Sequence, residues 1–105
     1  MNSNKDNFSA YGTHFQTKLL QSLLLDVKFF DRIFDILELE FFDSKTHKWI
    51  YEQIQKYFEK YKSPPTIDSL EMIAQSLPDD LLKNQAFEIF RTIKKAKVND
   101  VTFIK

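Results

Sequence analysis

The chain has 105 residues, enough for one domain with one hydrophobic core, and its 43% hydrophobic and 29% charged residues disfavour disorder. The lack of cysteine excludes disulfides and thiolate metal sites, and a formal net charge of zero lacks the positive excess of a primary nucleic-acid binder. The single glycine disfavours sheet-rich folds and glycine-rich phosphate loops, so we predict a small, soluble, all-α domain without a membrane span.

The N-terminal part of the chain predicts two helices. Residues 1–11 are polar and are expected to form a frayed lead-in. From Thr13, a candidate N-cap, apolar residues recur at the spacing of a helix with one buried face. Asp26 interrupts this pattern, and a second helix is predicted from residue 28 to about residue 37. The residues expected to face the core are Phe15, Leu19, Leu20, Leu23, Leu24, Phe29, Phe30, Ile33, Phe34 and Leu37.

The middle of the chain predicts the longest helix, over residues 45–61, with Asp43 or Ser44 as its cap. Two consecutive prolines end it, because proline cannot continue a helix and restricts the residue before it. Thr66 is the expected cap of a short helix over residues 67–76. The inward residues of these two helices are predicted to be Ile50, Ile54, Tyr57, Phe58, Tyr61, Ile67, Leu70, Ile73, Ala74 and Leu77.

A fifth helix is predicted to begin at residues 78–80 and to run to about residue 97. Asn99 and Asp100 indicate a break and a fresh cap, after which a further helix begins. Because one isolated turn is unstable in water, we expect the chain to belong to a longer protein. The predicted organisation is a compact bundle of about five helices over residues 12–98, followed by the start of a helix or linker over 99–105. The residues of the fifth helix that are expected to face the core are Leu82, Ala86, Ile89, Phe90 and Ile93.

Charge is segregated along the second half of the chain. Residues 66–80 carry four acids and no base, whereas residues 83–97 carry five bases and one acid. Opposite charge of this kind is typical of helices that pack as neighbours. We therefore expect the fourth and fifth helices to lie side by side.

The sequence offers no catalytic or metal-binding constellation. His14 and His47 lie far apart and do not form a ligand pair at helical spacing. Asp31 and Asp35 fall on a predicted wet face, and the carboxylates that start the fifth helix are explained by capping and the helix dipole. We predict that this chain is not itself an enzyme and holds no metal or cofactor.

Aromatic side chains are more numerous than one small core requires. The excess lies in a cluster formed by Phe41, Phe42, Trp49, Tyr51, Tyr57 and Tyr61. Three interpretations remain open: core packing, a protein–protein interface, or stacking on nucleic acid beside nearby lysines.

Four packing motifs follow one another between residues 11 and 105. A leucine-rich stretch, an acid and two aromatics occupy residues 19–30, and the segment Phe-Phe-Asp-Ser precedes the third helix. A tyrosine-bearing helix end then leads to a Pro-Thr-Ile-Asp turn at residues 65–68, and the sequence closes on NDVTFIK. In this order the motifs resemble the N-terminal domain of DnaB-type replicative DNA helicases, in particular the primase-associated helicases of tailed phages.

The resemblance implies a collar domain on a hexameric ring, which pairs with neighbouring subunits and docks primase or a helicase loader. It places ATP, Mg²⁺ and the motor residues in a separate C-terminal domain, and a P-loop needs two glycines where this chain has one. The resemblance implies that this domain does not bind DNA directly and that the full-length ring contacts it. The implied location is the cytoplasm, that of the host for a phage-encoded protein.

Six residues are predicted to contact partners. Three come from the third helix and three from the basic end of the fifth: Lys45, Trp49, Tyr51, Arg91, Lys94 and Lys95. Two alternatives stay open, a free-standing helical adaptor that binds one protein through its aromatic surface, and a nucleic-acid-binding module. A stop codon directly after residue 105 would favour the adaptor, and binding of single-stranded DNA at low salt would favour the module.

Overall fold

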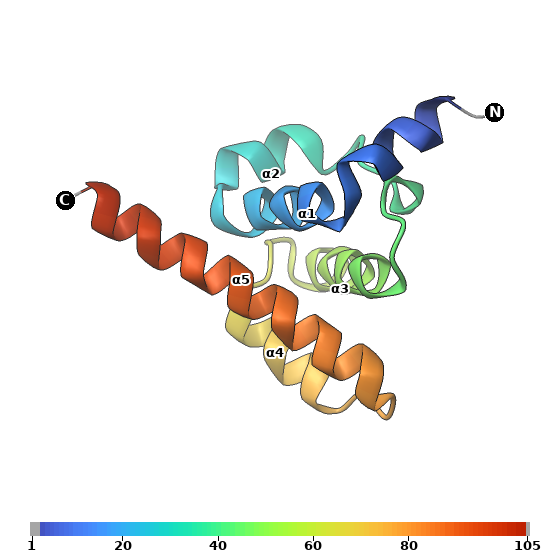
Figure 1. Cartoon of the computed structure of the whole chain (residues 1–105). Coiled ribbons are helices and arrows are strands. Elements are labelled where there is room, and N and C mark those ends of the chain that lie inside the picture. Colours follow the sequence, from blue (N-terminus) through green and yellow to red (C-terminus); the bar gives the residue numbers. More distant parts are fainter. Residues whose placement is uncertain (1–2, 105) are drawn as a thin grey trace.

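Five α-helices and one 3₁₀ turn make up the computed structural model, which describes residues 3–104 and, in side-chain detail, residues 14–97 (Figure 1). No strand occurs within residues 3–104, so the all-α prediction is confirmed. The elements are α1 (Ser3–Leu25), α2 (Val27–Ile33), η1 (Leu39–Phe41), α3 (Lys45–Tyr61), α4 (Ile67–Gln75) and α5 (Asp80–Ile104).

Side-chain caps set where the internal helices begin. Asp26 Oδ1 accepts a hydrogen bond from the Phe29 amide at 3.1 Å and starts α2. Ser44 caps α3 and Thr66 caps α4 in the same way, both as predicted. Asp79 accepts from the Leu82 amide at the start of α5. The predicted cap Thr13 lies outside the residues whose side chains are described.

Both ends of the chain differ from the prediction. Residues 3–11 are helical rather than a frayed lead-in, and Gly12 (φ 69°, ψ −169°) separates them from the rest of α1. Glycine adopts this backbone conformation without the steric penalty of a Cβ. The predicted break at Asn99–Asp100 is also wrong, because α5 stays helical to Ile104. Asn and Asp cap a helix only where the backbone departs from the helical conformation, and neither residue is sufficient to cause that departure.

The second helix ends earlier than predicted, at Ile33 instead of near residue 37. The chain turns over residues 34–36, and the Ile36 and Leu37 amides both donate to the Ile33 carbonyl. The Tyr51 hydroxyl from α3 donates to the Leu37 carbonyl at 2.5 Å. A long-range hydrogen bond of this kind is invisible to a reading of local periodicity.

The α3 helix lies at the centre of the packing. It contacts α1, α4, α5 and η1, and its Ile50, Tyr51 and Ile54 are completely buried. Around it α1 pairs with α2, and α4 lies along α5 (Figure 1). The prediction for Ile89 needs correction, because this residue is only partly buried at the edge of the core. Phe15 and Tyr61 also differ from their predicted inward positions, since the structure exposes both.

Ion pairs join α4 to α5. Lys94 Nζ lies 2.8 Å from Glu71 Oε1 and 3.7 Å from Asp68 Oδ1. The expectation that the acidic fourth helix packs beside the basic fifth is therefore confirmed. Within the described residues, no helix combines the length and the apolar character that crossing a bilayer requires.

Candidate interaction surfaces

The exposed start of α3 forms the first candidate surface. Lys45, Lys48 and Trp49 line a shallow groove whose other walls include Leu39 and Leu82. The Trp49 ring is half-buried, and the Lys45 side chain is 80% exposed. Lys45 Nζ lies 3.8 Å from a carboxylate oxygen of Asp79, a surface ion pair that water screens strongly. This surface therefore presents an aromatic ring beside the exposed Lys45 and the half-buried Lys48, and the acids Asp43 and Glu52 also line the groove.

Hydrogen bonds to two other helices hold the first turn of α3 in place. The Asp43 amide donates to Gln16 Oε1 of α1 at 2.9 Å, and Thr46 Oγ1 donates to Gln85 Oε1 of α5 at 2.6 Å. Gln16 is fully buried, and its Nε2 has no hydrogen-bond partner among the described residues. The start of α3 is therefore a fixed platform, not a loosely packed helix end.

His47 is buried beneath this platform. Its Nε2 lies 2.8 Å from Thr17 Oγ1, and its Nδ1 lies 2.8 Å from the hydroxyl of the cap residue Ser44. Burial lowers the pKa of His47 below its ordinary value of 6.5. The ring links α1 to the cap of α3, which assigns it a structural role.

Acid should weaken the fold through His47. The unfolded chain takes up this proton near pH 6.5, while the folded protein resists it, so stability is complete above that pH and falls as the pH decreases below it. Urea unfolding at about pH 7.5 and pH 5.5 measures the effect. The His47→Gln variant should lose less stability between about pH 7.5 and pH 5.5 than the original protein does. The variant His14→Gln, changed at an exposed histidine, should lose as much stability as the original protein. An equal loss in all three proteins would contradict this role.

Tyr51 does not belong to the surface, contrary to the prediction. It is fully buried, its ring centroid lies 5.1 Å from that of Phe42, and burial raises the pKa of its phenol to about 12. Its hydroxyl ties the carbonyl of Leu37 to α3. A partner meeting the folded domain cannot touch this side chain, so Tyr51 holds the core together.

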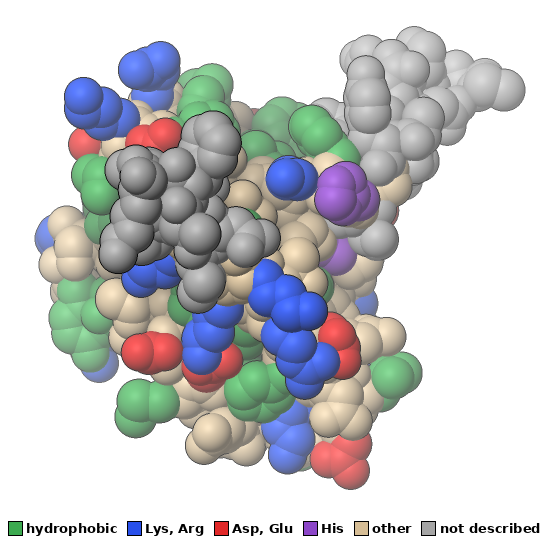
Figure 2. All heavy atoms as spheres, turned by 60° about the vertical axis from the view of Figure 1, so that its left-hand side comes forward, with side chains coloured by type: hydrophobic (Ala, Val, Ile, Leu, Met, Phe, Trp, Pro, Cys, Tyr) green, Lys and Arg blue, Asp and Glu red, His purple; other side chains and the backbone are tan. Residues whose placement is uncertain are grey.

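The basic residues of α5 form a second and separate surface. Lys and Arg side chains gather on the face shown in Figure 2, with Asp and Glu side chains among them. Arg91 pairs with Glu88 at 2.9 Å, and the hydrogen bond to Glu71 raises the pKa of Lys94. Lys95 is exposed and enters no ion pair within the described part of the chain. Two of the three predicted cations are thus already partly neutralised.

The two predicted sets do not form one site. Lys45 lies against Asp79 at the start of α5, whereas Lys94 lies fourteen residues beyond Asp80, about 21 Å along the helix axis. A single small partner would contact one of these surfaces.

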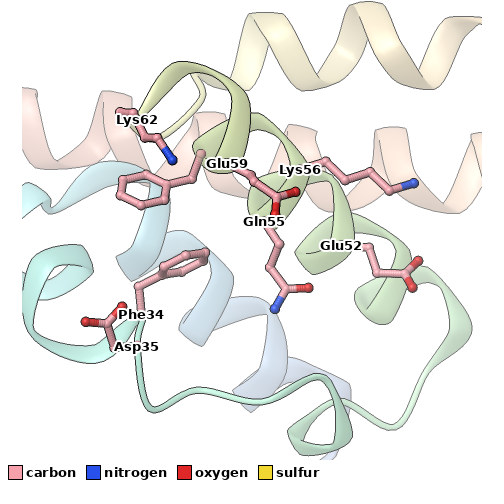
Figure 3. A pocket seen from close by; sticks show the side chains of 8 residues that line it. Phe34, Asp35, Glu52, Gln55, Lys56, Glu59 and Lys62 are labelled. Carbon is pink, nitrogen blue, oxygen red and sulfur yellow. The ribbon is translucent and has the colours of Figure 1, made fainter.

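Among the grooves of the described residues, two that border α3 were missed by sequence reasoning. One lies between the turn after α2 and α3, where Glu52, Gln55 and Glu59 share a wall with Lys56 and the opposite wall includes Asp35 (Figure 3). The second lies between α3 and α4 and contains Tyr57 and Tyr61. The signal for it was the spacing of these tyrosines, which also fits a buried face and was interpreted as one. Among the described residues, no group of three or more potential ligands is arranged to hold a metal ion.

Comparison with known families gives one match. The family model "DnaB-like helicase N terminal domain" matches residues 13–67, just over half of the chain, from α1 after its kink to the first residue of α4. No curated protein and no solved structure matches the chain. The matched segment contains the start of α3 with Lys45 and Trp49, whereas the basic residues of α5 lie outside it.

Proposed function

Because the chain belongs to the family of DnaB-like helicase N-terminal domains, we propose that it is the N-terminal interaction domain of a replicative DNA helicase. The observation that carries the proposal is the family match over residues 13–67, which contains the α3 residues Lys45 and Trp49 and the α1 residue Gln16 that holds the start of α3. In this role the domain joins neighbouring subunits and docks primase, while a separate motor domain hydrolyses nucleotide. The phage branch of the family, which we also propose, rests on the sequence motifs alone.

Ring symmetry explains how a weak docking surface is effective. A domain repeated around a closed ring presents the same patch several times, so that a partner with several contacts gains avidity. We place the partner contact on the start of α3, where Trp49 offers a half-buried ring and Lys45 an accessible charge. Tryptophan is among the residues that most often dominate the binding energy of protein interfaces. Of the three predicted α5 cations, Lys95 is exposed, has no ion pair within the described residues and is available to a second contact.

Trp49→Ala should weaken binding of the primase from the same replication system by about tenfold or more. Lys45→Glu should slow association and reduce its dependence on salt, because an accessible surface charge acts mainly on the encounter rate. Surface plasmon resonance with the immobilised domain measures both changes. Lys18→Glu, an equal charge change on the exposed side of α1, should have little effect.

Unchanged binding by both Trp49→Ala and Lys45→Glu, in variants whose helix content by circular dichroism matches the parent, would contradict this assignment. The reading frame provides an independent check. A P-loop domain encoded after residue 105 is expected, whereas a stop codon there would support the free-standing adaptor instead.

A further inference from the structure

The groove between α3 and α4 is an open surface lined by rings and aliphatic side chains. It has a volume of about 440 Å³. Tyr57, Tyr61 and two lysines line it from α3, and Met72 and Ile73 line it from α4. Tyr61 is 54% exposed and Met72 is 74% exposed. Neither side chain is needed to fill the core, so both are available to contact a partner.

The two rings in the groove lie against each other. The centroids of Tyr57 and Tyr61 lie 4.5 Å apart, and Lys60 Nζ lies 5.3 Å from the Tyr61 ring centroid. Met72 stands on the α4 wall with a flexible and polarizable side chain, which adapts to the shape of an apolar group. Apolar side chains that enter between the α4 wall and the rings would remove exposed hydrophobic surface from water.

Both charged residues that line the groove are cations. Lys56 and Lys60 line it, and none of its lining residues is acidic. The α4 acids Asp68 and Glu71 pair with Lys94 of α5, whereas Glu52 and Glu59 of α3 line the groove shown in Figure 3. The groove is therefore lined by apolar side chains and two cations, of which Lys56 also borders the groove of Glu52 and Glu59.

We propose that this groove docks an acidic amphipathic helix of a partner protein, with apolar side chains against Tyr61 and Met72 and carboxylates near Lys56 and Lys60. Helix-in-groove recognition requires a channel of this kind, and charge complementarity gives it a preferred occupant. Single-stranded nucleic acid fits less well, because Lys60 lies against the Tyr61 ring and the α4 wall is aliphatic. The groove is distinct from the Lys45–Trp49 surface, so either proposal can fail without the other.

A pair of synthetic peptides tests the proposal. Both are about 14 residues long, with leucine at positions i, i+3, i+4 and i+7; one carries glutamates at the remaining positions and the other lysines. Titration of the ¹⁵N-labelled chain with the acidic peptide should shift the amide resonances of Tyr57, Tyr61 and Met72, with affinity falling as salt rises. The basic peptide should bind at least about tenfold more weakly.

Matched variants locate the binding. The double variant Lys56→Glu and Lys60→Glu should bind the acidic peptide about tenfold or more weakly than the parent does, and it should bind the basic peptide more tightly. Met72→Ser should weaken binding of the acidic peptide, whereas Leu81→Ser, a similar change at a residue 68% exposed on α5 outside the groove, should leave affinity unchanged. Equal binding of both peptides, no shift at about 1 mM peptide, or resonance shifts confined to other surfaces would overturn the proposal. Tighter binding of about ten nucleotides of oligodeoxythymidine in the groove, or self-association through it, would also overturn it.

Discussion

Tyr51→Ala is expected to lower the free energy of unfolding by about 3–5 kcal/mol, enough to unfold a domain of ordinary stability at raised temperature. The side chain is fully buried beside Phe42 and Phe34, with ring centroids 5.1 Å and 5.8 Å away. Truncation leaves a cavity next to the central helix and frees the buried Leu37 carbonyl from its hydrogen bond. Urea or thermal unfolding followed by circular dichroism measures the loss.

Tyr51→Phe separates the hydroxyl from the ring. It should cost about 1–3 kcal/mol, since it leaves the Leu37 carbonyl without this donor. In the parent, the unfolded phenol ionises near pH 10 and the folded one near pH 12, so stability falls as the pH rises through that range. The phenylalanine variant should lose less stability there. A destabilisation of the alanine variant below about 1 kcal/mol would mean that Tyr51 is not a core residue.

Ile54→Ala is the second substitution with a large expected effect, and it should lower the free energy of unfolding by about 2–5 kcal/mol. Ile54 is fully buried on α3, and its truncation opens a cavity in the hydrophobic core to which it belongs. Ile36→Ala is the matched control, because the same atoms are removed from a side chain that is 67% exposed. That variant should change stability by about 0.5 kcal/mol or less. Similar losses in the two variants would contradict the assigned packing.

The sequence predicts those helix boundaries that rest on local chemistry. Ser44 and Thr66 act as the expected caps because an N-cap needs only one side-chain oxygen and the amide three residues on. The end of α2 was misplaced, and the turn that follows it is bound to α3 by the Tyr51 hydroxyl, a tertiary contact seventeen residues away from Phe34. Asn99 has the chemistry of a cap but lies within a continuous helix.

The surfaces were harder to predict than the fold. An apolar face at helical spacing fits both a core and a docking groove, so Tyr61 was expected to face inward although α4 leaves it exposed. Tyr51, which was predicted to contact partners, is buried, and its hydroxyl donates to the Leu37 carbonyl in the chain after α2. The packing of α4 beside α5 was predicted from the segregation of charge along the chain. Lys94 was predicted to contact a partner, whereas the structure pairs it with Asp68 and Glu71.

The most direct test of the proposed role is to delete this domain from the protein that its reading frame encodes. Full-length protein and the variant lacking residues 1–105 are compared for nucleotide hydrolysis and for primase binding by sedimentation velocity. If the chain is the interaction domain of a helicase, the deletion should retain nucleotide hydrolysis and lose primase binding. Primase binding that survives the deletion, or a full-length protein without nucleotide hydrolysis, would contradict the account.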